Sequence, residues 1–189
     1  ENMVYKNFLL RLFFSIFFIL TYSIFAFINF SLVFYLIIFI YIAIFIEIYL
    51  YFKKYKFYLI IYFFISFLFF ITIDFSESKF LSFNLFILIV ITFDIFSYLI
   101  GKTFGKNKLT KISPNKTYEG LLGGAAISFF TFLLFVLFYK ITINIELLYF
   151  VFIIIFSSFM GDIVESFFKR KNNLKNSSEI IPGHGGFFD

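Results

Sequence analysis

A stripe of polar side chains interrupts the last apolar stretch of the chain. Asp162, Glu165, Ser166 and Lys169 are spaced at i, i+3, i+4 and i+7, which places them on one face if a helix continues through them. Two carboxylates that face the interior of a helix bundle can hold a hard cation such as magnesium (Mg2+), while the lysine turns towards a phosphate group. The alternative is an internal salt bridge between Glu165 and Lys169, which would make the stripe structural.

An earlier apolar stretch carries a second polar group around a deeply placed carboxylate. Asp94, Tyr98 and Gly101 follow spacings of four and three, so a carboxylate, a phenol and a bare backbone patch share one helical face. Gly101 and Gly105 then bracket a short basic turn. A charge inside an apolar helix is costly, which makes Asp94 a candidate metal ligand or a neighbour of one. A packing face with an interfacial tyrosine is the structural alternative.

The loop after this turn leads directly into another apolar stretch. It contains Ser113 and Lys116, and Thr117 or Asn115 can cap the next helix and leave its first N–H groups facing the loop. Helix N-termini with nearby lysines suit phosphate groups, although a capped helix entry is also common where nothing binds. Small residues at positions 123–126 predict close contact with a neighbouring helix.

The tail of the sequence is a glycine-rich turn, Pro182-Gly183-His184-Gly185-Gly186, followed by two phenylalanines and Asp189. The backbone of such a turn can approach a ligand closely. His184 is the only histidine, and a lone histidine in a turn of this kind is more often structural than catalytic.

The composition determines which elements must position these residues. Of the 189 residues, 62% are hydrophobic, 27% are aromatic and only 14% are charged, so the chain has too little polar surface for a soluble domain. The absence of cysteine and the single histidine exclude disulfides, thiolate or polyhistidine metal sites and a cysteine nucleophile. Any bound metal would therefore need oxygen ligands.

Six stretches are long and apolar enough to span a bilayer, which predicts an all-α, polytopic membrane helix bundle. All but two of the 16 basic residues fall in one alternating set of connections, so the positive-inside rule predicts cytoplasmic termini. Glu47 lies inside the second stretch, where we expect it to reach the membrane interface or to pair with Lys53 or Lys54. The predicted spans are residues 8–28, 32–50, 57–73, 80–100, 121–138 and 147–168.

Three blocks of the sequence together resemble the phosphatidate cytidylyltransferase (CDP-diacylglycerol synthase) family. They are residues 94–105, residues 113–124 and residues 161–189, which together make up about half of the chain. The last block is long enough that chance is a poor explanation. The residues in register with the family's C-terminal signature are Ser166, Lys169, Arg170, Lys175, Pro182, Gly183, His184, Gly185, Gly186 and Asp189.

The resemblance implies that Asp162 and Asp189 bind Mg2+, with room for a second cation. Asp94 and Glu165 are further candidate metal ligands, and Lys169 is expected to act in catalysis beside the two aspartates. The residues expected to bind substrate phosphates are Ser113, Lys116, Arg170, Lys175 and His184.

The implied reaction is attack by the phosphate of phosphatidic acid on the α-phosphorus of CTP, which forms CDP-diacylglycerol and releases pyrophosphate. The expected partners are CTP, phosphatidic acid and membrane lipids, with a homodimer allowed and no nucleic acid. The expected location is a bacterial inner membrane, with the active site facing the cytoplasm. Residues 1–79 would form N-terminal membrane helices, and residues 80–189 the catalytic region with cytoplasmic loops 101–120 and 169–189.

The sequence departs from the family pattern in two respects. Asn176 stands where the family has aspartate, and the sequence stops at Asp189, before an expected arginine, a second aspartate and a further helix, so we expect a truncated protein or a fragment. The alternatives are a CTP-dependent polyprenol or phytol kinase, an ion-binding membrane transporter and an inactive relative. The glycine-rich tail favours the cytidylyltransferase over the kinase, and the clustering of charges at one face disfavours a transporter.

Overall fold

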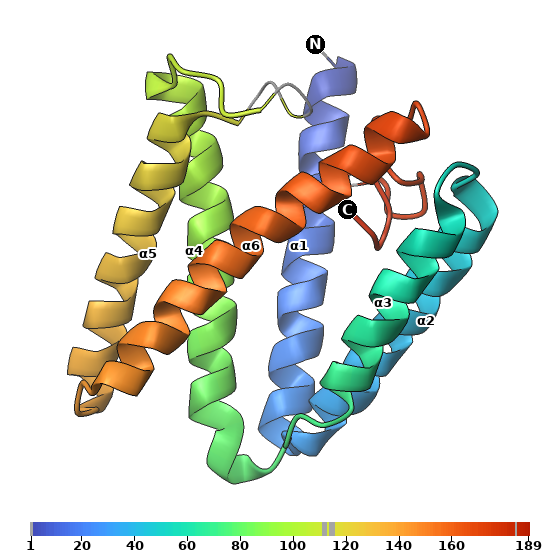
Figure 1. Ribbon diagram of the computed structural model, residues 1–189. Helices are drawn as coiled ribbons and strands as arrows, with labels where there is room; N and C mark the ends of the chain where they lie inside the picture. Colours follow the sequence, from blue (N-terminus) through green and yellow to red (C-terminus); the bar gives the residue numbers. More distant parts are fainter. Residues whose placement is uncertain (1, 111–112, 114–115, 184) are drawn as a thin grey trace. The chain divides into compact units, whose positions relative to one another are not determined.

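The computed structural model describes residues 2–110, 113, 116–183 and 185–189, and most of these residues are helical. The prediction of an all-α membrane protein is confirmed. Within the part of the chain that the structure describes, five helices are long and apolar enough to cross a bilayer, while α3 is shorter, with 15 residues. The helices are α1 (Asn2–Ile28), α2 (Ser31–Tyr51), α3 (Lys56–Phe70), the 3-10 helix η1 (Glu77–Lys79), α4 (Phe80–Phe104), α5 (Tyr118–Tyr139) and α6 (Ile145–Lys171), as Figure 1 shows.

The chain divides into two compact units. Unit 1 comprises Glu1–Phe80 and Phe168–Asp189, and unit 2 comprises Leu81–Phe167. Unit 1 therefore combines the N-terminal helices with the glycine-rich tail, although these segments are far apart in the sequence. The predicted functional division into residues 1–79 and 80–189 concerns activity and stays a prediction.

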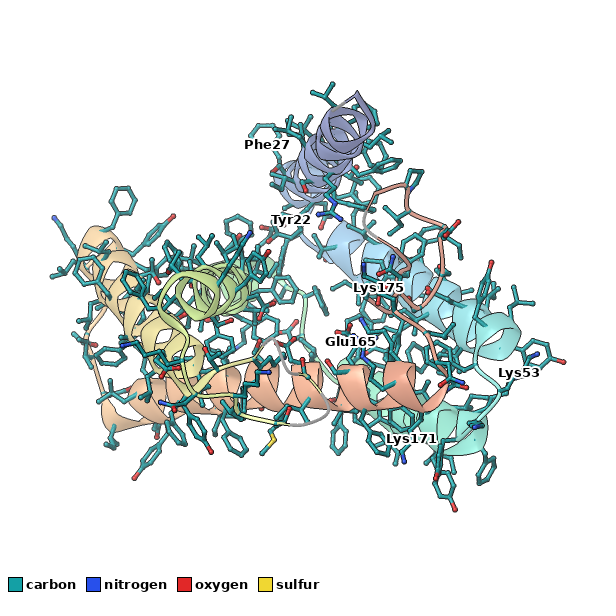
Figure 2. The ribbon with its side chains drawn as sticks, turned by 90° about the horizontal axis from the view of Figure 1, so that it is seen from above. Tyr22, Phe27, Lys53, Glu165, Lys171 and Lys175 are labelled. Atoms are coloured by element: carbon teal, nitrogen blue, oxygen red, sulfur yellow. The ribbon has the colours of Figure 1, made fainter. Side chains whose placement is uncertain are left out.

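In unit 1, α2 and α3 run side by side and are joined by a short turn in which Tyr55 has a positive φ of 58° (Figure 1). Their core includes Ile48, Phe52 and Leu59, all almost completely buried, and Phe188 from the tail packs against it. The helices of unit 1, α1 included, carry many exposed apolar side chains, as expected of side chains that face lipid. Figure 2 shows one example on α1, where Phe27 is 93% exposed and points away from the helix.

In unit 2, α4, α5 and the first part of α6 share a core that all three helices supply. The predicted close contact at the start of α5 is confirmed, because a Cβ atom added at Gly124 would come within 2.8 Å of the Ser97 side chain on α4. Further along the same pair of helices, the Thr92 hydroxyl lies 3.4 Å from the Ser128 hydroxyl. The core residues are Leu85, Ile89, Phe132, Val136, Val151 and Ile154.

Candidate active site

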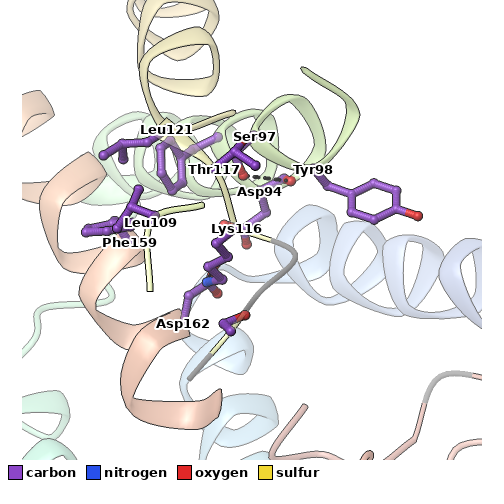
Figure 3. A pocket seen from close by; sticks show the side chains of 11 residues that line it. Asp94, Ser97, Tyr98, Leu109, Lys116, Thr117, Leu121, Phe159 and Asp162 are labelled. Carbon is purple, nitrogen blue, oxygen red and sulfur yellow. Dashed lines mark hydrogen bonds and ion pairs between the residues drawn. The ribbon is translucent and has the colours of Figure 1, made fainter. Parts of the chain in front are cut away.

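A cavity of about 220 Å³ in unit 2 brings together two of the predicted aspartates and a predicted lysine (Figure 3). Asp94 comes from α4, Asp162 from α6, and Lys116 from the loop that precedes α5. Lys116 points to Asp162 and forms an ion pair with it (Figure 3). The complete lining is Phe93, Asp94, Ser97, Tyr98, Leu109, Ser113, Lys116, Thr117, Leu121, Phe159 and Asp162.

The two aspartates meet at the same face of α6. The Ser158 hydroxyl donates a hydrogen bond of 3.0 Å to Asp94 Oδ1, and Ser158 lies one helical turn before Asp162. The helix continues unbroken to Lys171, which is the condition that the predicted polar stripe required. Tyr98 contributes less than its spacing suggested, because its side chain is 62% exposed and points away from Asp162 (Figure 3).

The loop before α5 is ordered by its own hydrogen bonds where the structure describes it. The Lys116 N–H donates to the Ser113 carbonyl at 3.0 Å, and the Lys116 carbonyl accepts from the Leu109 N–H at 2.8 Å. Thr117 caps α5, since its hydroxyl accepts the Gly120 N–H at 3.1 Å. The alternative cap, Asn115, lies outside the described residues. These contacts place both Ser113 and Lys116 at the cavity wall, and their role in substrate binding stays a prediction.

The donor set of this cavity fits a magnesium ion. Asp94 and Asp162 offer carboxylate oxygens, and Ser113 and Thr117 offer hydroxyl groups at the same wall. Among the described residues, no cluster of three or more His, Cys, Asp or Glu side chains has the arrangement of a metal site. Magnesium is typically held by one or two carboxylates, with waters and substrate phosphates completing its shell, so two aspartates are sufficient.

A second hollow of about 380 Å³ adjoins the end of α4 and the cap of α5, and its wall is strongly basic. Lys102, Lys106 and Lys108 line it, together with Thr117 and bare glycine backbone. The turn is held in shape by Glu119, which accepts a 2.9 Å hydrogen bond from the Asn107 side chain. Three lysines beside a helix N-terminus suit an anionic ligand such as a phosphate group.

The tail of the chain forms a separate polar cluster in unit 1, centred on Asp189. Its Oδ1 accepts a hydrogen bond of 2.7 Å from the Lys169 ammonium. Its Oδ2 accepts three more, from the N–H and hydroxyl of Ser177 at 2.8 and 2.9 Å and from the Gly186 N–H at 3.0 Å. Burial alone would raise the pKa of Asp189, but the hydrogen bonds from Lys169, Gly186 and Ser177 hold it below its ordinary value of 3.8.

The remaining predicted site residues are Arg170, Lys175 and His184, in the range of unit 1, and Glu165 in unit 2. Arg170 donates to the Leu174 carbonyl at 3.1 Å and so shapes the turn after α6. Lys175 is exposed and Glu165 is half-buried on α6 (Figure 2), while His184 lies outside the described residues. Asp162 and Asp189 belong to different units, so their joint role in metal binding stays a prediction.

Comparison with known proteins agrees with this combination of membrane helices, paired aspartates and lysines. The cytidylyltransferase family matches residues 2–189. The chain belongs to this family. No solved structure matches the chain.

Several relatives carry the name phosphatidate cytidylyltransferase. The protein from Staphylococcus epidermidis is 44% identical over 118 residues, which cover 60% of this chain and 45% of the relative. Those from Staphylococcus haemolyticus and Staphylococcus aureus are 45% and 46% identical over 105 residues, which cover 54% of this chain and 40% of each relative. The chain thus covers less than half the length of these relatives.

The structure also reveals contacts that the sequence did not suggest. The expectation that Glu47 reaches the interface or pairs with Lys53 or Lys54 is wrong, because Glu47 is fully buried and accepts the backbone N–H groups of Phe187 and Phe188. No local pattern predicts this contact, since its partners are about 140 positions away. The sequence signals only that Glu47 needs a partner, because an acidic residue within an apolar helix is costly.

Asn172 is a second residue whose contacts were not predicted. Its side-chain oxygen accepts the Lys53 and Lys54 N–H groups at 2.9 and 2.7 Å, and its amide donates to the carbonyls of Lys54 and Phe168. It thereby fastens the turn between α2 and α3 to the end of α6.

Proposed function

We propose that the protein containing this chain transfers CMP from CTP to phosphatidic acid, forming CDP-diacylglycerol and pyrophosphate. The observation that carries the proposal is the cavity in which Asp94, Asp162 and Lys116 converge between apolar helices of a cytidylyltransferase family member. The names of the relatives supply the substrate class.

The main obstacle to this reaction is the repulsion between two anionic phosphates. Lys116 and the lysines of the adjoining basic hollow provide positive charge for phosphate oxygens. Asp94 and Asp162 would hold magnesium, which when bound neutralises phosphate charge and favours departure of pyrophosphate. The nucleophile is an oxygen of the lipid phosphate, so no protein nucleophile is required.

Lys116 both pairs with Asp162 and can bind the substrate phosphate. Its ion pair with Asp162 holds the ammonium group at the cavity wall before substrate arrives. When a phosphate binds, the same ammonium can donate to it while Asp162 stays directed into the cavity, because an ammonium carries three N–H donors.

The proposal includes the side of the membrane on which the reaction occurs. Nine of the 16 basic residues lie at positions 102–116 and 169–175, which comprise the ends of α4 and α6 and the segments that follow them. This clustering favours a cytoplasmic position for both regions under the positive-inside rule. CTP would then enter from the cytoplasm of a bacterium, and phosphatidic acid would arrive laterally within the inner membrane.

The test uses membranes that contain the full-length protein, phosphatidic acid and magnesium, with CTP labelled either at the α- or at the γ-phosphate. CMP transfer puts the α-label into lipid and the γ-label into pyrophosphate. A γ-label found in lipid would instead show transfer of the terminal phosphate and would overturn the proposal. Omission of phosphatidic acid should abolish lipid labelling.

A further inference from the structure

Glu47 joins the N-terminal helices to the glycine-rich tail through a fully buried carboxylate. Its Oε2 accepts the Phe187 N–H at 2.7 Å and the Phe188 N–H at 3.1 Å. The Glu47 side chain is 0% exposed, so these bonds are shielded from water. Loss of the acceptor would leave two shielded N–H groups without a partner, which costs more than the loss of an exposed hydrogen bond.

Aromatic contacts surround this connection and hold the same two tail residues. The ring of Phe188 lies 5.1 Å from that of Phe52 and 5.5 Å from that of Phe63, measured between centroids. The ring of Phe187 lies 6.3 Å from that of Phe39 in an edge-on arrangement. The backbone of the tail is therefore fixed by Glu47, while its side chains pack on α2 and α3.

Gly186 shows how closely the tail approaches this carboxylate. A Cβ atom added at Gly186 would collide with the Glu47 carboxylate and with the Ser177 hydroxyl. Gly186 and Ser177 in turn donate to Asp189, whose other oxygen accepts the Lys169 ammonium. A continuous set of contacts thus connects Glu47 with the Lys169–Asp189 pair.

We propose that Glu47 is a positioning residue that holds the glycine-rich tail, and with it the Lys169–Asp189 pair, in the arrangement that binds substrate. The link to substrate rests on the proposed function, whereas the anchoring of the tail does not. Glu47 itself touches no reacting group. Its effect is to raise the fraction of molecules whose tail is already ordered when CTP arrives.

Ordering of the tail by Glu47 should appear in the KM for CTP. If only part of the population has an ordered tail, the apparent affinity for substrate falls in proportion to that fraction. Loss of the two buried hydrogen bonds in Glu47→Ala should release the tail and raise the KM for CTP about tenfold. Glu47→Gln keeps one carbonyl oxygen that can accept both N–H groups, so its KM for CTP should stay close to that of the unmodified protein.

Release of the tail can be measured without activity, because the chain contains no cysteine. Ser178 is 6% exposed and lies in the tail, so Ser178→Cys provides a single buried thiol as a reporter. The reporter is introduced into the full chain, and the rate of labelling by a water-soluble maleimide is measured in detergent. Adding Glu47→Ala should speed labelling at least about tenfold, and adding Glu47→Gln should speed it much less.

Two controls and one independent variant complete the design. Glu77→Gln alters a carboxylate that also accepts a backbone N–H, from Phe30 at 2.9 Å, and should leave the labelling rate unchanged. Gly186→Ala disturbs the same contact from the side of the tail and should speed labelling even if Glu47→Ala fails to fold. Gly161→Ala is its matched control, since an added Cβ there meets no atom within 4 Å.

Unchanged labelling in both Glu47→Ala and Gly186→Ala would overturn the inference. Faster labelling in either variant, with both controls unchanged, would support the anchoring of the tail. If labelling responds as expected but the unmodified protein forms no CDP-diacylglycerol, the proposed function fails while the anchoring role of Glu47 stands.

Discussion

Lys116 and Asp162 form an ion pair that joins the residue before the cap of α5 to the cavity face of α6. Their side chains are 24% and 33% exposed, and both line the cavity that a phosphate would enter. The pair connects the loop before α5, which the sequence analysis identified as a helix entry, with the polar stripe on α6, which it identified from helical spacing. It also makes the cavity of unit 2 the natural target for mutation.

Replacement of Lys116 by methionine should weaken CTP binding more than it affects folding. Methionine keeps much of the side-chain length but removes the charge, so a phosphate bound in the cavity loses one charge-assisted hydrogen bond. We expect the KM for CTP to rise about tenfold or more. Lys140→Met, at an exposed position after α5, should leave the KM unchanged. An unchanged KM in Lys116→Met would remove Lys116 from the binding site.

The close packing of α4 against α5 should be sensitive to a single methyl group. In Gly124→Ala the new Cβ would lie within 2.8 Å of the Ser97 side chain and 2.9 Å of its backbone nitrogen. Such overpacking should lower the free energy of unfolding by about 1–3 kcal/mol, measured by thermal or denaturant unfolding in detergent. Gly161→Ala has open space around its added Cβ and should not have this effect.

The anchoring of the turn between α2 and α3 should depend on Asn172. Asn172→Ala removes two acceptor and two donor contacts to backbone groups, which should cost about 1–3 kcal/mol in free energy of unfolding. Lys175→Ala, which shortens an exposed side chain in the same segment, serves as the control. Equal unfolding midpoints for the two variants would contradict the anchoring role.

The tail should loosen when Asp189 is protonated. The pKa of Asp189 in the folded protein lies below the ordinary value of 3.8, so its ionised form stabilises the tail. This stabilisation is complete above the ordinary pKa and is lost as the pH falls through the lower, folded-state pKa. Pepsin cleavage in the tail, measured between pH 5 and pH 2, should therefore increase with acid more steeply than the intrinsic activity of pepsin does.

The matched variant for this prediction is Asp189→Asn, which keeps the shape of the side chain but cannot ionise. Its tail should be cleaved readily across the whole range, with only the pH dependence of pepsin itself. Identical pH profiles for the two proteins would show that the ionisation of Asp189 does not order the tail.

The helices and the individual polar residues of the unit 2 cavity could be recognised in the sequence, because both depend on local patterns. Helical spacing identified the polar face around Asp162, and the loop with Ser113 and Lys116 stood out as basic and as a helix entry. The apolar run at positions 57–73 was longer than the helix it forms, since α3 ends at Phe70 and the chain turns before Asp74. Helix ends depend on such turns, which hydropathy alone does not resolve.

The contacts of Glu47 and Asn172 could not be predicted in the same way. Both residues bind backbone groups more than 100 positions distant, and backbone groups carry no sequence signal. Helical spacing already suggested a phosphate partner for Lys169, whereas the role of Asp189 was assigned from the resemblance. The structure adds that they form one ion pair, embedded in hydrogen bonds of the tail.

The proposed role of Asp162 in CMP transfer can be tested by comparing Asp162→Asn with Glu146→Gln. Glu146 lies in the exposed first turn of the same helix, far along the chain from the cavity residues. Transfer of α-labelled CMP to phosphatidic acid is measured at equal expression and saturating magnesium. We expect a loss of at least about a hundredfold in Asp162→Asn and full activity in Glu146→Gln. Equal activity in the two variants would contradict this role.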